Sequence, residues 1–160
     1  MQIVVLPIGS SGSGKSTWIQ KINADNRFVV ISADMIRLEL TGSIDDKSHD
    51  DKIYDMIKRR AVIELKFSKN VIIDTTNLQK TRRRDFLDYL ERFAGVDYVV
   101  NYKLLPVEPF IAKARIAAQL ANSEHRANVP DDTIDRHAEL YKIALDDIKF
   151  EQMTPYEEHC

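Results

Sequence analysis

Short apolar runs alternate with longer segments of helical period along this chain. The runs are rich in β-branched residues and too short for helices, which is typical of buried strands in a parallel sheet. We expect strands at residues 3–6, 28–31, 71–73 and 98–105. We expect helices at residues 15–24, 34–40, 49–67, 81–93 and 106–121, and a last helix from Pro130. This order predicts an α/β, three-layer fold in which a short parallel sheet of about four strands is flanked by helices.

Apolar positions within the predicted helices recur on one face, which predicts the side that packs on the sheet. In the longest segment of this kind they recur every four positions, at Ile53, Ile57, Ala61 and Leu65. The inward positions of the helices at 81–93 and after Pro130 are Phe86, Leu87, Leu90 and Phe93, and Ile134, Ala138, Tyr141, Leu145 and Ile148.

The composition is that of a globular protein with one core, since 44% of the 160 residues are hydrophobic and 30% are charged. The net charge of −2 excludes a polycation, so nucleic acid would have to bind at a local patch. No apolar stretch approaches the roughly 20 residues that span a bilayer. The single cysteine, Cys160, leaves no disulfide within the chain. We expect a cytoplasmic protein without a membrane partner, with one domain at residues 1–150 and a tail at 151–160.

Ligands of parallel α/β sheets bind beyond the carboxyl ends of the strands. A glycine-rich motif occupies this place after the first predicted strand, where Gly9, Gly14, Lys15 and Ser16 match G-x-x-x-x-G-K-[ST] completely. Backbone N–H groups of such a loop cradle phosphate oxygens, the lysine reaches the β- and γ-phosphates, and the serine hydroxyl binds Mg²⁺. A flexible Gly/Ser linker does not fit between a strand and a helix. We expect ATP or another NTP, with Mg²⁺, to be held by Gly9, Ser11, Gly12, Ser13, Gly14, Lys15, Ser16 and Thr17.

Asp34 and Arg37 follow the second predicted strand and share a helix face, because they are three residues apart. A carboxylate at this edge accepts the proton of an attacking hydroxyl, and an arginine fixes an anionic group of the acceptor. A surface ion pair at a helix start would explain the same two residues. Their place beside a phosphate loop favours an acceptor site.

Asp74 ends the third predicted strand and is followed by Thr75, Thr76 and Asn77. A carboxylate after an apolar strand is where P-loop enzymes hold Mg²⁺, often through water. A turn aspartate is the alternative explanation. The apolar residues before Asp74 place it at the sheet edge, which favours the metal role, together with Ser16. Thr76 and Asn77 offer neutral hydrogen bonds to a substrate.

Three motifs together resemble the polynucleotide kinase family, and they occur in that family's order over nearly the whole chain. The motifs are the phosphate loop through Trp18, Ile-Ser-x-Asp-x-x-Arg at residues 31–37, and Ile-Ile-Asp-x-Thr-Asn-Leu at residues 72–78. The likeness extends more distantly to zeta-toxin and adenylate-kinase-like P-loop kinases. It implies a P-loop NTPase fold with a helical lid, and transfer of the γ-phosphate of ATP to a 5′-hydroxyl of DNA or RNA.

The resemblance also implies roles for single residues. Lys15, Ser16 and Arg126 would contact the donor phosphates, and Asp34 would be the general base. Arg37 would hold the acceptor phosphate, while Asp74 and Thr76 would lie near the metal and the acceptor. The implied catalytic residues are Asp34, Lys15 and Arg126.

The lid is expected at about residues 115–130, where this family carries paired arginines close together. Here Arg115 is followed by Ile116 and by further helix-forming residues, so the family's spacing is not kept. Arg126 stands shortly before Val129-Pro130, as the lid arginine does in the family. We favour Arg126 and leave Arg115 open as the alternative. Separate phosphatase and ligase partners would complete end healing, and the oligomeric state stays open.

A basic run, Lys80 with residues 82–84, opens the fourth predicted helix. One face of this run fits a phosphodiester backbone. A solvated basic face explains the same residues equally well.

The leading hypothesis is therefore a kinase for the 5′-hydroxyl end of a nucleic acid in repair, which includes phage-encoded enzymes. A kinase of the same fold that acts on a hydroxymethylated base in phage DNA, on a nucleotide or on a small metabolite is the first alternative. A nucleotide-dependent switch or regulatory ATPase is the second. The absence of an N-K-x-D motif from the sequence argues against a GTPase.

Overall fold

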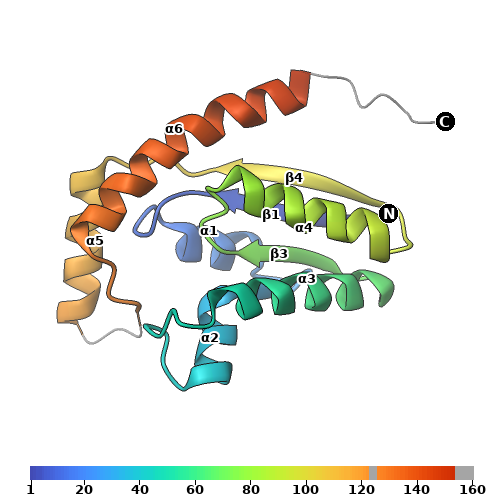
Figure 1. The fold of residues 1–160 in the computed structure, drawn as a ribbon, viewed down its shortest axis with the longest axis horizontal. Coiled ribbons are helices and arrows are strands. Elements are labelled where there is room, and N and C mark those ends of the chain that lie inside the picture. The colour runs from blue at the N-terminus through green and yellow to red at the C-terminus, as the bar shows by residue number, and fades with distance from the viewer. Residues whose placement is uncertain (123–125, 154–160) are drawn as a thin grey trace.

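The computed structural model of the protein describes residues 1–122 and 126–153. Part of the predicted lid, at 123–125, and most of the predicted tail, at 154–160, lie outside the described residues. The helices and strands are β1 Gln2–Ile8, α1 Lys15–Ile22, β2 Phe28–Ser32, α2 Ala33–Thr41, α3 Asp50–Lys66, β3 Asn70–Asp74, α4 Lys80–Phe93, β4 Tyr98–Leu104, α5 Pro109–Ala121 and α6 Asp131–Met153 (Figure 1).

The four strands form one parallel sheet in the order β2-β3-β1-β4. β1 is central, and its Val4 is paired with Val71 of β3 on one side and with Val100 of β4 on the other. The predicted α/β fold with about four parallel strands is thus confirmed. Because all strands run the same way, the residues that follow them meet at one edge of the sheet.

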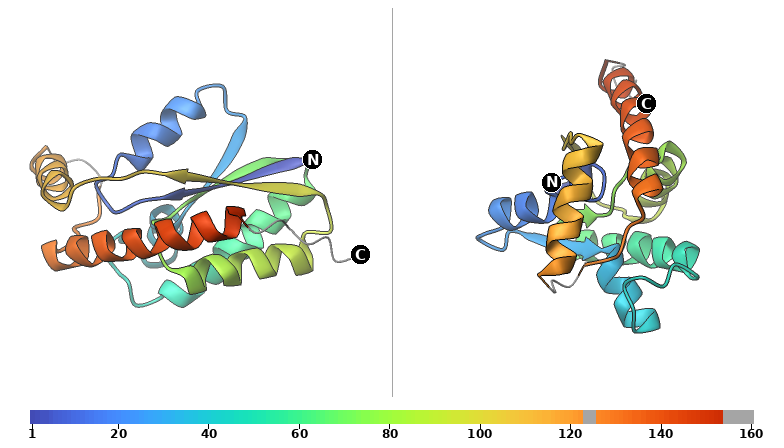
Figure 2. Two further views of the ribbon diagram at one scale, coloured as in Figure 1. Left: turned by 90° about the horizontal axis from the view of Figure 1, so that it is seen from above. Right: turned by 90° about the vertical axis from the view of Figure 1, so that its left-hand side faces the viewer.

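Helices cover both faces of the sheet, but unequally, as Figure 2 shows in the view from above. The larger core lies under α3, α4 and α6 and takes up Val4, Leu6 and Ile8 of β1. Val5 points to the opposite face and packs with Ile19 of α1. This alternation is the period of two that a strand imposes on its side chains. α5 lies at the end of the sheet where the phosphate loop turns.

The predicted inward faces are mostly confirmed. The four positions predicted on α3 are buried to at least 99%. Phe93 was expected in the core but is 45% exposed, so this prediction was wrong. It lies at the last turn of α4 against Tyr89, with ring centroids 4.6 Å apart, while Leu90 and Ala94 fill the core positions.

Two further observations concern the helices. α5 begins at Pro109, three residues after the predicted start, because Glu108 is extended and proline suits the first turn of a helix. Within the described residues, no helix is both long and apolar enough to cross a bilayer.

Candidate active site

The loop between β1 and α1 depends on glycine at two positions. Gly12 and Gly14 have φ values of 78° and 90°, in the left-handed region that glycine adopts without strain. A Cβ atom on Gly12 would lie 2.7 Å from the carbonyl oxygen of Ala112 in α5. Glycine at this position therefore allows α5 to pack directly against the loop.

The loop presents a set of hydrogen-bond donors. Lys15 Nζ donates to the carbonyl oxygens of Gly9 and Ser10, at 3.1 Å each. The Ser13 hydroxyl is buried and has no hydrogen-bond partner in the described part of the chain. No described side chain caps α1 at Gly14, so the first N–H groups of the helix are available to an anion. These donors fit the triphosphate of a nucleotide.

The surroundings of Lys15 change the pKa of its ammonium group. Burial lowers the pKa of Lys15 to about 8, and the charge of Arg126 acts in the same direction. The carboxylates of Asp74 and Asp34 oppose this shift. Lys15 is therefore mostly protonated at pH 7, and a phosphate group beside it would raise its pKa again.

A cleft of about 1300 Å³, open solvent at its mouth included, joins the loop to the predicted catalytic residues. Residues 11–18 line it together with Asp34, Asp74, Arg115 and Arg126. These side chains come from the start of α2, the end of β3, the middle of α5 and the segment before α6. The parallel sheet thus brings together residues that are far apart in the sequence.

The predicted magnesium ligands lie in this cleft. Burial raises the pKa of Asp74, and Lys15 opposes the shift with its positive charge. The exposed Ser16 supplies a hydroxyl in the same cleft. Among the described residues, no group of three or more His, Cys, Asp or Glu side chains forms a closed metal site. A hydroxyl and a carboxylate fit Mg²⁺, which keeps several waters and binds substrate phosphates.

Arg37 is held between two carboxylates and is 92% buried, since its side chain is 8% exposed. Its Nη1 contacts Asp34 Oδ1 at 2.6 Å, and its Nη2 contacts Asp50 Oδ1 of α3 at 2.9 Å. Asp34 itself is 55% exposed and opens into the cleft. The pair therefore fixes the direction of the Asp34 carboxylate and leaves its second oxygen accessible.

The loop after β3 is tied to the phosphate loop. The backbone N–H of Gly9 donates to the carbonyl oxygen of Thr76 at 3.1 Å. The Asn77 amide nitrogen donates to the carbonyl oxygens of Pro7 and Ile73, at 2.8 and 2.9 Å. Its amide oxygen accepts from the Thr75 hydroxyl at 2.8 Å. We therefore assign the Asn77 side chain to the shape of this loop, in place of the predicted substrate contact, because its amide protons are already used.

Both candidate lid arginines lie at the cleft. Arg115 Nη1 donates to the carbonyl oxygen of Gly12 at 3.1 Å, so it contacts the phosphate loop directly. Arg126 lines the same cleft and lowers the pKa of Lys15. In the adjoining segment, the Asn128 N–H donates to Asp45 Oδ1 at 2.8 Å, which links the segment before α6 to the loop before α3.

One residue that lines the cleft, and one whose pKa Lys15 influences, were missed from the sequence. Gln119 lies one helical turn after Arg115, lines the cleft, and has a buried Oε1 without a hydrogen-bond partner among the described residues. Its spacing from Arg115 was a usable signal. Burial lowers the pKa of His137 to about 4, with contributions from Lys15 and other cations. His137 is therefore neutral at pH 7, and no sequence pattern marked it.

The basic run of α4 does not form one solvated face. Arg83 is 97% buried, and its Nη1 donates to the carbonyl oxygens of Asn77 and Leu78 at 2.9 and 2.8 Å. Lys80 contacts Asp147 of α6 at 3.1 Å. Arg82 contacts Asp51 of α3 at 2.8 Å. Lys80, Arg82 and Arg83 are thus engaged in contacts with other parts of the protein.

Comparisons with solved structures agree with this fold. Two structures of a Pnkp1/Rnl/Hen1 complex match, and one of them is described as an RNA repair complex. The first is 21% identical with a TM-score of 0.76 and covers 91% of this chain and 46% of that chain. The second is 25% identical with a TM-score of 0.59 and covers 71% and 39%. This chain therefore spans less than half the length of those chains.

A smaller kinase also shares the fold. A gluconokinase from Sinorhizobium meliloti 1021 is 18% identical, with a TM-score of 0.54, over 87% of this chain and 73% of the gluconokinase. No curated protein sequence matches the chain. The family model described as "AAA domain" (AAA_33) matches residues 4–143, which include the phosphate loop, Asp34, Asp74 and both candidate lid arginines. The predicted likeness to P-loop kinases is confirmed. The chain belongs to this AAA domain family and has the fold of P-loop kinases.

Proposed function

We propose that this protein transfers the γ-phosphate of ATP to the 5′-hydroxyl end of a nucleic acid. The observation that carries the proposal is the position of Asp34, whose carboxylate opens into the phosphate-loop cleft while Arg37 holds it from behind. A carboxylate in this place is needed for an acceptor hydroxyl and has no role in a nucleotide switch. This arrangement favours a kinase over the predicted alternative of a regulatory ATPase.

The reaction follows from the side chains that line the cleft. Asp34 accepts the proton of the attacking hydroxyl, whose oxygen forms a bond to the γ-phosphorus. The bond from that phosphorus to the β–γ bridging oxygen breaks, and ADP leaves with the electron pair. Lys15 and Arg126 stabilise the negative charge that the transferred group carries. Mg²⁺, held by Ser16 and through water by Asp74, would neutralise charge on the donor phosphates.

Support for a nucleic-acid acceptor comes from three sources. The motifs at residues 31–37 and 72–78 resemble those of polynucleotide kinases. Two matched structures belong to a Pnkp1/Rnl/Hen1 complex, one of which is described as an RNA repair complex. Arg37 supplies a guanidinium group directly beside Asp34, and the resemblance implies that this group holds an acceptor phosphate. We further propose that separate nucleic-acid processing enzymes act beside this protein.

A small-molecule acceptor is the second candidate, and the fold shared with a gluconokinase favours it. The two candidates differ in the product that they form. We expect γ-labelled ATP to label a 5′-hydroxyl oligonucleotide, with the label removable by a phosphatase, and not to label the same oligonucleotide carrying a 5′-phosphate. Release of the label as inorganic phosphate without transfer would contradict both candidates.

A further inference from the structure

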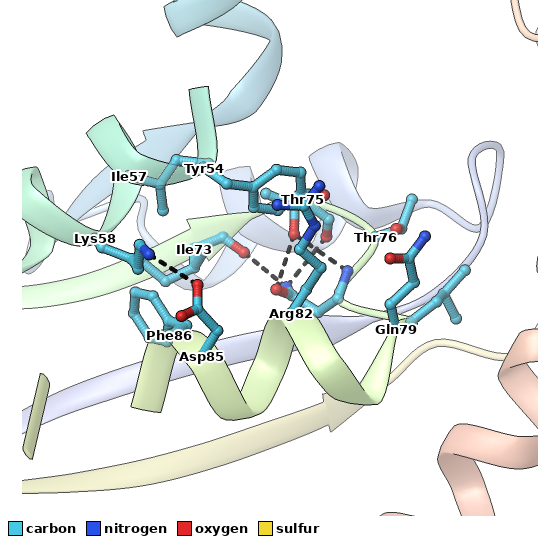
Figure 3. Close-up of a pocket in the computed structure, with 12 residues that line it drawn as sticks. Tyr54, Ile57, Lys58, Ile73, Thr75, Thr76, Gln79, Arg82, Asp85 and Phe86 are labelled. Carbon is cyan, nitrogen blue, oxygen red and sulfur yellow. Dashed lines mark hydrogen bonds and ion pairs between the residues drawn. The ribbon is translucent and has the colours of Figure 1, made fainter. Parts of the chain in front are cut away.

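A second depression lies between α3 and α4, beside the loop after β3 at residues 75–79, which we call the acceptor loop (Figure 3). Its enclosed space is small, about 40 Å³, and the rest of the depression is open to solvent. Ile57, Ile73 and Phe86 form its apolar part, and Thr76 and Gln79 supply hydrogen-bonding groups. The mechanism proposed above assigns no role to this pocket.

One wall of the pocket consists of an aromatic ring and a cation. The guanidinium carbon of Arg82 lies 4.2 Å from the centroid of the Tyr54 ring, so the two groups are stacked. Figure 3 shows the Tyr54 and Arg82 side chains next to each other, with Thr76 and Gln79 further along the pocket. Aromatic rings and arginine planes with neutral hydrogen-bonding neighbours are typical of sites for nucleobases.

A short series of contacts leads from the Asp34 carboxylate to the pocket. Arg37 joins Asp34 to Asp50 at the start of α3, and Tyr54 lies one turn, about 6 Å, further along that helix. The charge of Arg37 also acts on the Tyr54 phenol, whose pKa is raised mainly by burial. On the other side, Thr75 directly follows Asp74 of the cleft. A chain molecule whose end is at Asp34 would therefore pass this pocket next.

Arg82 can change its partner at little cost. It contacts Asp51, which is 94% exposed, and an ion pair with so exposed a carboxylate contributes about 0–1 kcal/mol. A phosphodiester offers the same guanidinium a charge-assisted bond of better geometry. The neighbouring Lys58 has its own partner, Asp85, at 2.8 Å.

We propose that this pocket binds the nucleotide that follows the 5′-terminal one of a polynucleotide acceptor. Its base stacks on the Tyr54–Arg82 pair, and its phosphodiester takes the place of Asp51 on Arg82. Stacking is tolerant of base identity, so the pocket selects for chain length and not for sequence. This inference rests on the proposed function and adds to it a reason for preferring a polymer end.

The test compares acceptors of different length. The kcat/KM for γ-phosphate transfer is measured with a nucleoside 3′-monophosphate, a 5′-hydroxyl dinucleotide and a 5′-hydroxyl hexanucleotide. For the unmodified protein we expect the dinucleotide to exceed the monophosphate about tenfold or more, the amount that one stacked base contributes. Arg82→Gln and Tyr54→Leu should each reduce this ratio about tenfold. Arg84→Gln is the matched control, because Arg84 is exposed on the same helix and outside the pocket lining.

The possible outcomes distinguish a failure of the pocket proposal from a failure of the proposed function. No transfer to any of the three acceptors would overturn the proposed function and the pocket together. Transfer with equal kcat/KM for monophosphate and dinucleotide would overturn the pocket alone. The same would follow if Arg82→Gln kept the ratio of the unmodified protein, or if Arg84→Gln lowered it equally. The ATP affinity and the circular dichroism spectrum of each variant are measured as well. If both are unchanged, a reduced ratio of kcat/KM values is not caused by unfolding of the variant.

Discussion

Arg115 Nη1 donates a hydrogen bond to the carbonyl oxygen of Gly12, at 3.1 Å, and so connects α5 to the phosphate loop across 103 residues of sequence. The contact lies where α5 packs on the loop, since Gly12 also faces the backbone of Ala112. The orientation of α5 and the shape of the loop thus depend on each other.

Removal of the Arg115 side chain should weaken nucleotide binding more than it slows transfer. We expect Arg115→Ala to raise the Kd for ATP about tenfold, the value of one charge-assisted hydrogen bond. Lys113→Ala is a suitable control, because Lys113 is on the same helix but contacts Asp135 of α6. Trp18 is the single tryptophan and lines the cleft, so its fluorescence can report the Kd. An unchanged Kd with a strongly reduced kcat would assign Arg115 to the transition state.

Arg126 is expected to act mainly on the rate. It lies in the cleft close enough to Lys15 to lower the pKa of that group, and such a cation stabilises the transferred phosphoryl group. Arg126→Ala should reduce kcat about 100-fold or more, with a smaller change in the Kd for ATP. If Arg115→Ala lost more of kcat than Arg126→Ala, the assignment of the lid arginine would be reversed.

Asp34 should be dispensable for nucleotide binding and necessary for transfer. We expect Asp34→Asn to lower kcat by about 10²- to 10⁴-fold, the contribution of a general base, and to leave the Kd for ATP within about twofold. Asp50→Asn is the comparison, because Asp50 contacts Arg37 from α3 and does not line the cleft. An equal loss of ATP affinity and of kcat in Asp34→Asn would contradict the assignment of Asp34 as the general base.

ATP binding should weaken as the pH rises through about 8. The pKa of Lys15 in the free protein is about 8, and a bound phosphate raises it, so binding requires a proton above that pH. Affinity is therefore highest below pH 8 and decreases by up to about tenfold per pH unit above it. Measurements of the Kd for ATP from pH 6.5 to 9.5 test this prediction. Lys15→Arg should remove the decrease in affinity, because arginine stays protonated over this range. A flat profile for the unmodified protein would contradict it.

Arg83 should matter for stability more than its neighbours do. It is 97% buried and donates to two backbone carbonyl oxygens of the acceptor loop. Arg83→Leu leaves those oxygens without their donor, so we expect a loss of about 2–3 kcal/mol in the free energy of unfolding. Arg84→Leu, at an exposed position, should change it by less than about 0.5 kcal/mol. Denaturant unfolding of both variants measures the difference.

The sheet and the phosphate loop could be predicted because their signals are local. Strand runs such as 71–73 are apolar throughout, and the pattern of Gly9 to Ser16 is found within eight residues. Asp34 could also be predicted, since the position after a strand places a residue at the ligand edge of a parallel sheet. These predictions need no knowledge of long-range contacts.

The remaining features depend on contacts that no local pattern carries. Arg83 looks like its exposed neighbours in the sequence and is buried only because α6 and the acceptor loop enclose it. Phe93 keeps the period of α4 but lies beyond the end of the core. The Asn77 side chain stabilises the loop after β3, because the carbonyl oxygen of Pro7 in β1 lies within hydrogen-bond distance of its amide nitrogen. Tertiary packing decides each of these cases.

Direct competition between acceptors tests the central claim. One reaction contains the protein, γ-labelled ATP, a 5′-hydroxyl oligonucleotide, a duplex with hydroxymethylated bases, and a panel of small hydroxylated metabolites that includes gluconate. We expect the label at the 5′ end of the oligonucleotide, with a kcat/KM about 100-fold or more above that of any other acceptor, because only the polymer end can occupy both the Asp34 site and the adjoining pocket. Label on a metabolite or on the modified duplex, with none on the oligonucleotide, would contradict the account.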